Sequence, residues 1–247
     1  MIELDTIYNK DCIEGMKELH DSCVNLVLTS PPYNIGKTLT HGKKSVDIGY
    51  DDTRDDYFGF LCNAIDEMIR VSKQYVFLNI QPLANNKTDI YRIFGKYAYK
   101  IKEVIIWHKK RSPPQINSSC LRPNFEYIIC FDKKTPEKRA FDGIDFGHKG
   151  LHKTCWDGQI NDLFYNENFD SKNHHAIFPI WLPRRIIELF SKENDVVLDP
   201  FMGCGTTAVA CKQLNRRYIG FEIDKSHYDV AVKRLDGAPE RVSDWFD

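Results

Sequence analysis

The stretch VVLDPFMGCGTT, residues 196–207, decides the fold of this 247-residue chain. Its first four residues form a short β-branched, apolar run that ends in Asp199, as a buried strand of an α/β sheet does. Two glycines separated by one residue then let the backbone turn tightly and come close to a ligand. Thr206 or Thr207 can cap a following helix. The order of strand, glycine loop and helix predicts a nucleotide-like ligand at the carboxyl end of a strand.

A second expected strand ends in Glu222, 23 residues after Asp199. An acidic residue about 20 positions after a glycine loop can hold the ribose hydroxyls of a cofactor. Asp199 directly before the loop would repel a pyrophosphate, and Ala208 stands where a dinucleotide motif has its third glycine. A cofactor with a ribose and a cationic amino-acid end suits both carboxylates. The residues therefore favour S-adenosylmethionine over a dinucleotide.

Outside this unit, short apolar runs alternate with amphipathic helical stretches. The expected strands are 24–29, 75–79, 104–107, 127–131, 196–199 and 218–222. The expected helices are 57–68, 183–190, 206–214 and 226–235. This alternation predicts an α/β protein with a doubly wound, mostly parallel sheet. Residues 34–56 are polar and are expected to form a mobile loop, and residues 133–173 are expected to be an insertion outside the sheet.

The tetrapeptide Ser30-Pro31-Pro32-Tyr33 follows the first central strand, at the end of a strand where ligands bind in open α/β sheets. Its prolines remove two backbone donors, so the turn presents acceptors. Such a turn suits a substrate that is itself an amine, such as the exocyclic amine of a base. If Ser30 and the Pro31 carbonyl each accepted one hydrogen of that amine, its nitrogen would become more tetrahedral and its lone pair would be available. Tyr33 offers a face on which a flipped base can stack, worth about 1–3 kcal/mol. A Pro-Pro pair alone would indicate only a stiff turn.

The formal charge of −1 gives no bulk signal for a nucleic acid, but the charge is unevenly distributed. Residues 96–153 contain thirteen Lys and Arg against six Asp and Glu. This excess indicates a face for a polyanion, with a solvated lysine-rich surface as the alternative. The eight cysteines form no CxxC pair and fit no zinc spacing, so no metal is expected. Without a secretion signal or an apolar run of roughly 20 residues, a cytoplasmic protein with no membrane span is expected.

Five motifs resemble those of the S-adenosylmethionine-dependent amino-methyltransferases of DNA. The resemblance is to the permuted, or beta, class, in which the catalytic motif precedes the cofactor motif and the fold is Rossmann-like. It covers nearly the whole chain except about residues 133–173. The matching segments are Thr29–Tyr33, Asp199–Thr207, Gly220–Asp224, His174–Pro179 and Asn9–Cys12.

The resemblance implies direct transfer of a methyl group from S-adenosylmethionine to the amine of a flipped base, without a metal. Residues 1–132 would be the catalytic half, 133–173 a target-recognition insertion and 174–247 the cofactor-binding half. The catalytic residues would be Ser30, Pro31, Pro32 and Tyr33. The cofactor contacts would be Asp11, Phe178, Pro179, Asp199, Phe201, Gly203, Gly205, Thr206, Thr207 and Glu222.

Double-stranded DNA is the expected partner. The basic residues expected on its phosphates are Lys109, Lys110, Arg111, Lys133, Lys134, Lys138 and Arg139. Because the insertion is small, a second subunit in a homodimer is left open, as is a cognate restriction endonuclease. Glu126, which would be costly to bury unpaired, matches a family position near the target-base pocket.

Serine at the first motif position is the version usually associated with N4-cytosine methylation, so cytosine is favoured over the N6 amine of adenine. RNA or a protein glutamine is an alternative substrate, because related motifs ending in PPY occur in those methyltransferases. A non-catalytic DNA-binding protein is the third alternative. The joint presence of the tetrapeptide, the glycine loop and Glu222 argues against it.

Overall fold

An eight-stranded sheet forms the centre of the computed structural model, which describes residues 2–36, 38–41, 44–47, 51–110, 119, 121, 124–146, 153–158 and 179–238. The strands in spatial order are β1 (Thr6–Tyr8), β10 (Arg217–Phe221), β9 (Val196–Asp199), β2 (Val24–Thr29), β5 (Ser72–Ile80), β7 (Phe125–Asp132), β6 (Ile101–Lys109) and β8 (Cys155–Gly158). Among these eight, β7 alone runs opposite to the others. The predicted mostly parallel α/β fold is confirmed.

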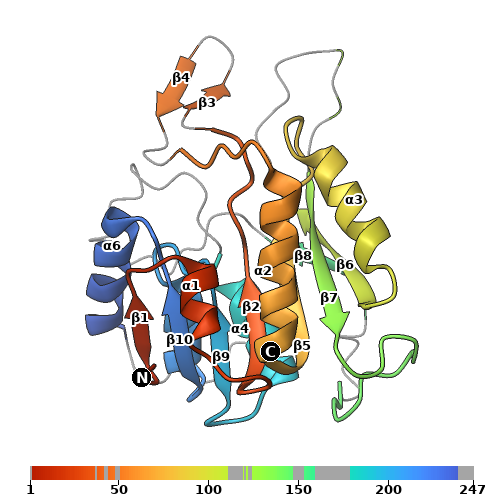
Figure 1. Ribbon diagram of the computed structural model, residues 1–247, viewed down its shortest axis with the longest axis vertical. Coiled ribbons are helices and arrows are strands. Elements are labelled where there is room, and N and C mark those ends of the chain that lie inside the picture. Colours follow the sequence, from red (N-terminus) through yellow and green to blue (C-terminus); the bar gives the residue numbers. More distant parts are fainter. Residues whose placement is uncertain are drawn as a thin grey trace.

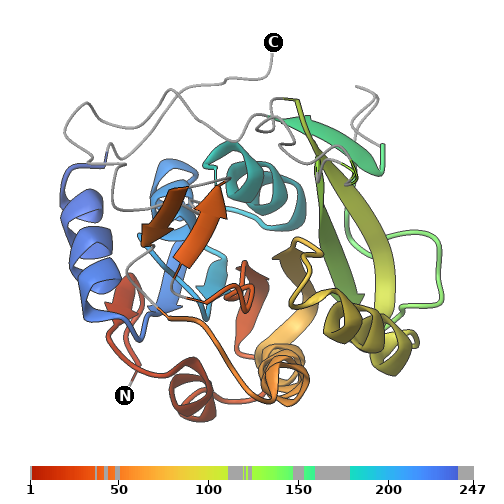
Figure 2. The same ribbon diagram turned by 90° about the horizontal axis from the view of Figure 1, so that it is seen from above.

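Helices cover both faces of the sheet, as Figure 2 shows from above. One face carries α1 (Cys12–Lys17), α2 (Tyr57–Val71) and α3 (Lys87–Tyr97), and the other carries α4 (Trp181–Phe190), α5 (Thr206–Gln213) and α6 (Lys225–Asp236). The central strand β2 shows why, because its successive side chains Val27 and Leu28 are both fully buried and belong to the two separate cores. A strand covered on both faces carries apolar side chains on both, as Leu26, Val27 and Leu28 of β2 do.

The segment after the tetrapeptide is not a plain loop. It contains an antiparallel hairpin, β3 (Thr38–His41) and β4 (Lys44–Asp47), which Figure 1 shows beyond the carboxyl ends of the parallel strands. Below the hairpin, Arg54 N donates to Asn34 Oδ1 at 2.8 Å and Gly36 N donates to Asp52 Oδ1 at 2.6 Å. These bonds close the base of the segment, so the predicted mobile loop contains a hairpin with a hydrogen-bonded base.

The prediction that residues 133–173 lie outside the sheet is wrong, because β8 comes from this segment and pairs with β6 at the edge of the sheet. All six predicted strands and all four predicted helices are present, most of them a few residues longer or shorter than expected. The short elements β1, α1 and β8 and the longer helix α3 were not predicted. In the described ranges no helix is both long enough and apolar enough to cross a membrane.

Candidate active site

The predicted catalytic turn and the predicted cofactor loop begin side by side. Strands β2 and β9 are parallel neighbours, with Val27 paired to Leu198, so Thr29 and Asp199 end their strands together. Thr29 Oγ1 donates to Asp199 Oδ1 at 2.5 Å, and Thr207 Oγ1 donates to the other carboxylate oxygen at 2.5 Å. The Phe201 amide also donates to Oδ1, at 3.0 Å. The carboxylate therefore joins two segments that lie 170 residues apart in the sequence.

This carboxylate is almost completely enclosed, with Asp199 2% exposed. Burial raises the pKa of Asp199 to about 6, against the opposing effect of the hydrogen bonds from Thr207, Thr29 and the Phe201 amide. Burial disfavours the charged form, whereas donors pointing at the charge favour it. The observed partners of Asp199 are groups of its own chain, and its contact with a cofactor stays a prediction.

The glycine loop turns through two left-handed positions, Gly203 with φ 55° and Gly205 with φ 83°. A Cβ at Gly205 would lie 3.0 Å from the Cβ of Ala231 on α6, so this glycine permits close packing of the loop against a helix. A Cβ at Gly203 would meet nothing within 4 Å. The loop therefore has one side packed against the protein and one open side, as a ligand-facing loop requires.

Glu222 follows β10 directly and holds this loop from the next strand. Its Oε2 accepts from Gly203 N at 2.7 Å and its Oε1 from Asp224 N at 2.8 Å. Burial raises the pKa of Glu222, and the two backbone N–H groups oppose that rise. The spacing of 23 residues from Asp199 thus brings Glu222 to the glycine loop, where the sequence predicted it.

The structure describes all of the remaining predicted cofactor residues except Phe178. Asp11 caps α1 by accepting from the amides of Ile13 and Glu14, and the Lys10 amide next to it donates to the Glu222 carbonyl at 3.1 Å. Pro179 is buried and precedes Ile180, the N-cap residue of α4. The ring of Phe201 packs edge-on against Phe60 with centroids 5.7 Å apart, and Thr206 is the buried first residue of α5. Phe178, with the rest of 174–177, lies outside the described residues.

The tetrapeptide is held through two of its carbonyls. Tyr57 OH donates to Pro32 O at 2.6 Å, and Asn86 Nδ2 donates to Tyr33 O at 2.8 Å. No donor in the described part of the chain reaches the Pro31 carbonyl. Pro31 is buried, and the carbonyl that the sequence assigned to an amine has no donor among the described residues.

The side chains of the turn lead into a polar chain that crosses to neighbouring strands. Ser30 Oγ lies 3.1 Å from Tyr33 OH, and Tyr33 OH donates to Glu126 Oε2 at 2.8 Å. Lys109 Nζ pairs with Glu126 Oε1 at 2.6 Å and also donates to Gln81 Oε1 at 3.1 Å. Burial and the charge of Glu126 raise the pKa of Tyr33 well above its normal value, so the phenol stays neutral. The sequence singled out Glu126 but gave no partner for it.

The basic residues predicted on DNA do not form one face. Lys109 forms an ion pair with Glu126, and its side chain is only 10% exposed. Its neighbour Lys110 is exposed at the carboxyl end of β6. Arg111 lies outside the described residues. The other four, Lys133, Lys134, Lys138 and Arg139, lie in or after the turn that follows β7.

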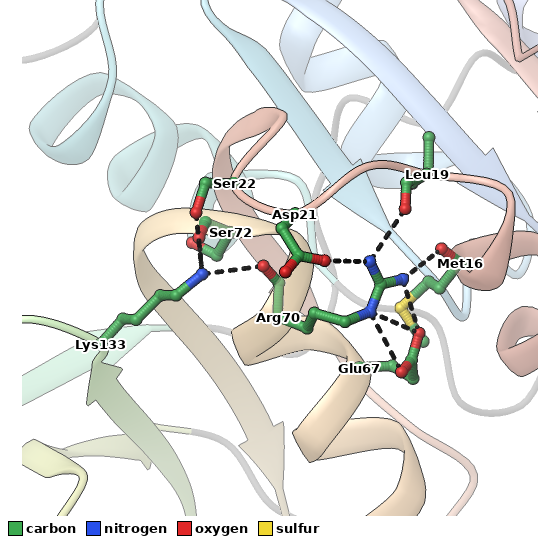
Figure 3. A network of polar contacts seen from close by, with 8 residues as sticks. All are labelled: Met16, Leu19, Asp21, Ser22, Glu67, Arg70, Ser72 and Lys133. Atoms are coloured by element: carbon green, nitrogen blue, oxygen red, sulfur yellow. Dashed lines mark hydrogen bonds and ion pairs between the residues drawn. The ribbon is translucent and has the colours of Figure 1, made fainter.

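Lys133 belongs to a network of polar contacts, drawn in Figure 3, at the end of the sheet away from the tetrapeptide. Its ammonium donates to Ser22 Oγ at 2.8 Å and to the carbonyls of Arg70 and Ser72 at 2.8 and 3.2 Å. Its backbone N–H donates to the Gln74 carbonyl. Gln74 lies four residues along β5 from Leu78, which is paired with Thr29. At 3.3 Å per residue this places it at least about 13 Å from the catalytic turn. The structure does not bring Lys133 together with the tetrapeptide.

Comparison with known proteins identifies the family of the chain. Residues 24–233 match the family of N6 and N4 methyltransferases described as DNA methylase. The type II methyltransferase M.HinfI of Haemophilus influenzae is 30% identical over 94% of this chain and 68% of its own length. The type II methyltransferase M.BglII of Bacillus subtilis is 27% identical over 96% of this chain and 70% of its own length.

Two solved structures share the fold. PvuII DNA methyltransferase (cytosine-N4-specific) superposes with a TM-score of 0.74 at 16% identity, over 95% of this chain and 87% of that one. The M1.HpyAVI–SAM complex has a TM-score of 0.65 at 23% identity, over 94% of this chain and 98% of that one. With the family match spanning most of the sequence, the chain belongs to the DNA methylase family of amino-methyltransferases.

Proposed function

We propose that this protein transfers a methyl group from S-adenosylmethionine to the exocyclic N4 amine of a flipped cytosine in double-stranded DNA. The observation that carries the proposal is the Thr29–Asp199–Thr207 cross-link. It fixes the acceptor-rich turn, which begins at Ser30, against the glycine loop that would hold the cofactor. The methyl donor and the amine would therefore meet across two adjacent strand ends.

The residues at the glycine loop fit S-adenosylmethionine. Each oxygen of Glu222 accepts one backbone N–H, which leaves a lone pair on each for a ribose hydroxyl. The open side of Gly203 gives the ligand room. We propose that Asp11, Phe178, Pro179, Phe201 and Thr206 complete the pocket. The enclosed Asp199 would act on the cationic end of the ligand mainly through its charge. The cofactor, when bound, supplies an electrophilic methyl group on its sulfonium.

The turn would prepare the amine for attack. The nitrogen lone pair of an exocyclic amine is delocalised into the ring of the base. Ser30 Oγ and the Pro31 carbonyl would each accept one amine hydrogen, which returns the lone pair to nitrogen and stabilises the developing positive charge. Because the amine is out of reach of this pocket in a stacked duplex, the base must be flipped out.

Ser30 in place of aspartate supports cytosine over adenine, since the family associates serine at this position with N4 methylation. The test is to methylate DNA with the purified protein, digest it to nucleosides and identify the modified base. We expect N4-methylcytosine, and Ser30→Ala should bind the cofactor normally and transfer no methyl group. N6-methyladenine as the sole product would overturn the assignment of the base, and a methylated RNA or protein would overturn that of the substrate.

The DNA-contacting surface is proposed at the carboxyl ends of the strands, with exposed Lys110 as its first member. Lys134, Lys138 and Arg139 would contact DNA only if the duplex also reached the turn after β7. The type II names of the two relatives support a cognate restriction endonuclease as a functional partner, and a homodimer would enlarge the small recognition region. With such partners, the protein would act in the cytoplasm.

A further inference from the structure

We propose that Glu126, held by Lys109, is a positioning residue that makes the Ser30 hydroxyl an obligate hydrogen-bond acceptor toward the target amine. The inference rests on the proposed function and assigns a role to two residues outside the tetrapeptide. Both come from antiparallel neighbours in the sheet, because Glu126 lies on β7 and Lys109 ends β6.

The Glu126 carboxylate has its two oxygens directed at different partners. Oε1 lies 2.6 Å from Lys109 Nζ and Oε2 lies 2.8 Å from Tyr33 OH. Both side chains of the ion pair are enclosed, with 7% exposed for Glu126 and 10% for Lys109. A carboxylate with its countercharge this close is ionised and can only accept hydrogen bonds. Tyr33 must therefore donate its phenolic hydrogen to Glu126.

That donation decides the direction of the next bond. A phenol has one hydrogen, and Tyr33 has spent it on Glu126. The 3.1 Å contact between Ser30 Oγ and Tyr33 OH then requires Ser30 to be the donor. With its only hydrogen directed at Tyr33, Ser30 can offer nothing but lone pairs to a ligand. The polarity of the serine is thus set three side chains away, by the charge of Lys109.

An obligate acceptor selects the chemistry of the base. The amino groups of cytosine and adenine donate hydrogens and match it, whereas a keto oxygen at the same ring position presents lone pairs to lone pairs. Uracil and hypoxanthine are the keto counterparts of cytosine and adenine. The chain from Lys109 to Ser30 would therefore reject keto bases before any methyl transfer takes place.

Glu126→Gln reverses the chain while keeping its shape. Lys109 can only donate, so the glutamine carbonyl turns to Lys109 and its NH₂ to Tyr33. Tyr33 must then donate to Ser30, whose hydrogen is released toward the amine. We expect kcat to fall by about 10²-fold, as when one electrostatic contact to a transition state is lost. The Kd for S-adenosylmethionine should stay unchanged, whereas the melting temperature should fall, because the enclosed ammonium of Lys109 loses its countercharge.

The decisive measurement is a ratio of two Kd values for DNA binding. The first is for a duplex that carries the keto analogue at the target position, and it is divided by the Kd for the normal duplex. The ratio for Glu126→Gln should fall by at least about tenfold relative to the wild type, because the energy of base flipping cancels between the two proteins. Glu188→Gln, which removes the same charge from an exposed position on α4, should behave like the wild type.

A double-mutant cycle separates positioning from a structural role. In a Tyr33→Phe background the chain is already cut, so Glu126→Gln should cause no further loss of kcat. Additive losses, or an unchanged ratio of Kd values, would refute the inference. If Glu126→Gln does not fold, Tyr33→Phe alone should lower the same ratio, because it frees the Ser30 hydrogen. If the wild-type protein methylates no DNA amine, the proposed function is refuted and this inference falls with it.

Discussion

Replacement of either threonine at the cross-link by valine should weaken the fold in a pH-dependent way. Thr29 and Thr207 are 0% and 1% exposed, and each donates to one oxygen of Asp199 at 2.5 Å. Valine keeps the volume and removes the hydroxyl. A hydrogen bond to a charged group contributes about 1.5–3 kcal/mol, so each variant should lose about that much unfolding free energy at pH 8. In a protein of this size that corresponds to a fall in Tm of about 3–10 °C.

The pH dependence follows from the ionisation of Asp199. Burial raises the pKa of this carboxyl from 3.8 to about 6, so the folded protein binds the proton more tightly than the unfolded chain. The stability that the group contributes is greatest below pH 4 and is lost as the pH rises through 6, by about 3 kcal/mol for two pKa units. The threonine hydroxyls oppose that loss by stabilising the charged form. Their removal should therefore matter most above pH 6.

Urea denaturation followed by tryptophan fluorescence measures this at pH 8 and pH 5. We expect the loss in Thr29→Val and Thr207→Val to shrink at pH 5 to the value of a neutral hydrogen bond, about 1 kcal/mol. Thr6→Val is the control, because its hydroxyl donates to the Leu4 carbonyl at the surface, 3.3 Å away. It should change stability by less than about 0.5 kcal/mol at either pH. Equal losses at both pH values in the buried variants would refute the assignment of charge to Asp199.

Two further predictions concern the lysines and the glycine loop. Lys133→Met should lower the unfolding free energy by about 1–3 kcal/mol with no change in the salt dependence of DNA binding. Lys110→Met should leave stability unchanged and reduce the salt slope by about 0.9, and the opposite pattern would place DNA at the other end of the sheet. Gly205→Ala should destabilise by about 2 kcal/mol or more, because strain at φ 83° adds to a 3.0 Å contact with Ala231. Gly203→Ala, where the space is open, should cost only about 1 kcal/mol in thermal unfolding; an equal cost at both glycines would contradict the packing argument.

The sequence predicted the elements whose side chains follow one clear period. The buried strands β2 and β9 each contain a short apolar run, Leu26–Leu28 and Val196–Leu198, and the glycine loop between β9 and α5 has its own turn chemistry. Helix α3 was missed although Ile90, Ile93 and Tyr97 recur at helical spacing and are buried, because polar residues surround them. The strand β1 has three residues and β8 has four, too few for an alternation to be read.

The site shows the same division. Position at a strand end is a local property, so Ser30, Asp199 and Glu222 could be placed from the sequence. The partners of Glu126 could not, because Tyr33 lies 93 residues away and the pairing depends on which strands become neighbours. The location of the lysines in the fold could not be predicted for a related reason. A run of basic residues gives a charge but not the end of the sheet at which it lies, and Lys133 lies at the end away from the catalytic turn.

The order of the strands has a consequence for synthesis of the protein. Strands β1 and β2 leave the ribosome first, yet β10 and β9, made about 190 residues later, lie between them. The growing chain must therefore keep two apolar strand edges unpaired until its last quarter is available. Such contacts between distant residues form slowly, and open edges invite aggregation. We expect chains that stop before β9 to be insoluble or bound by chaperones, and the C-terminal quarter to complete the site and the fold in the same late step.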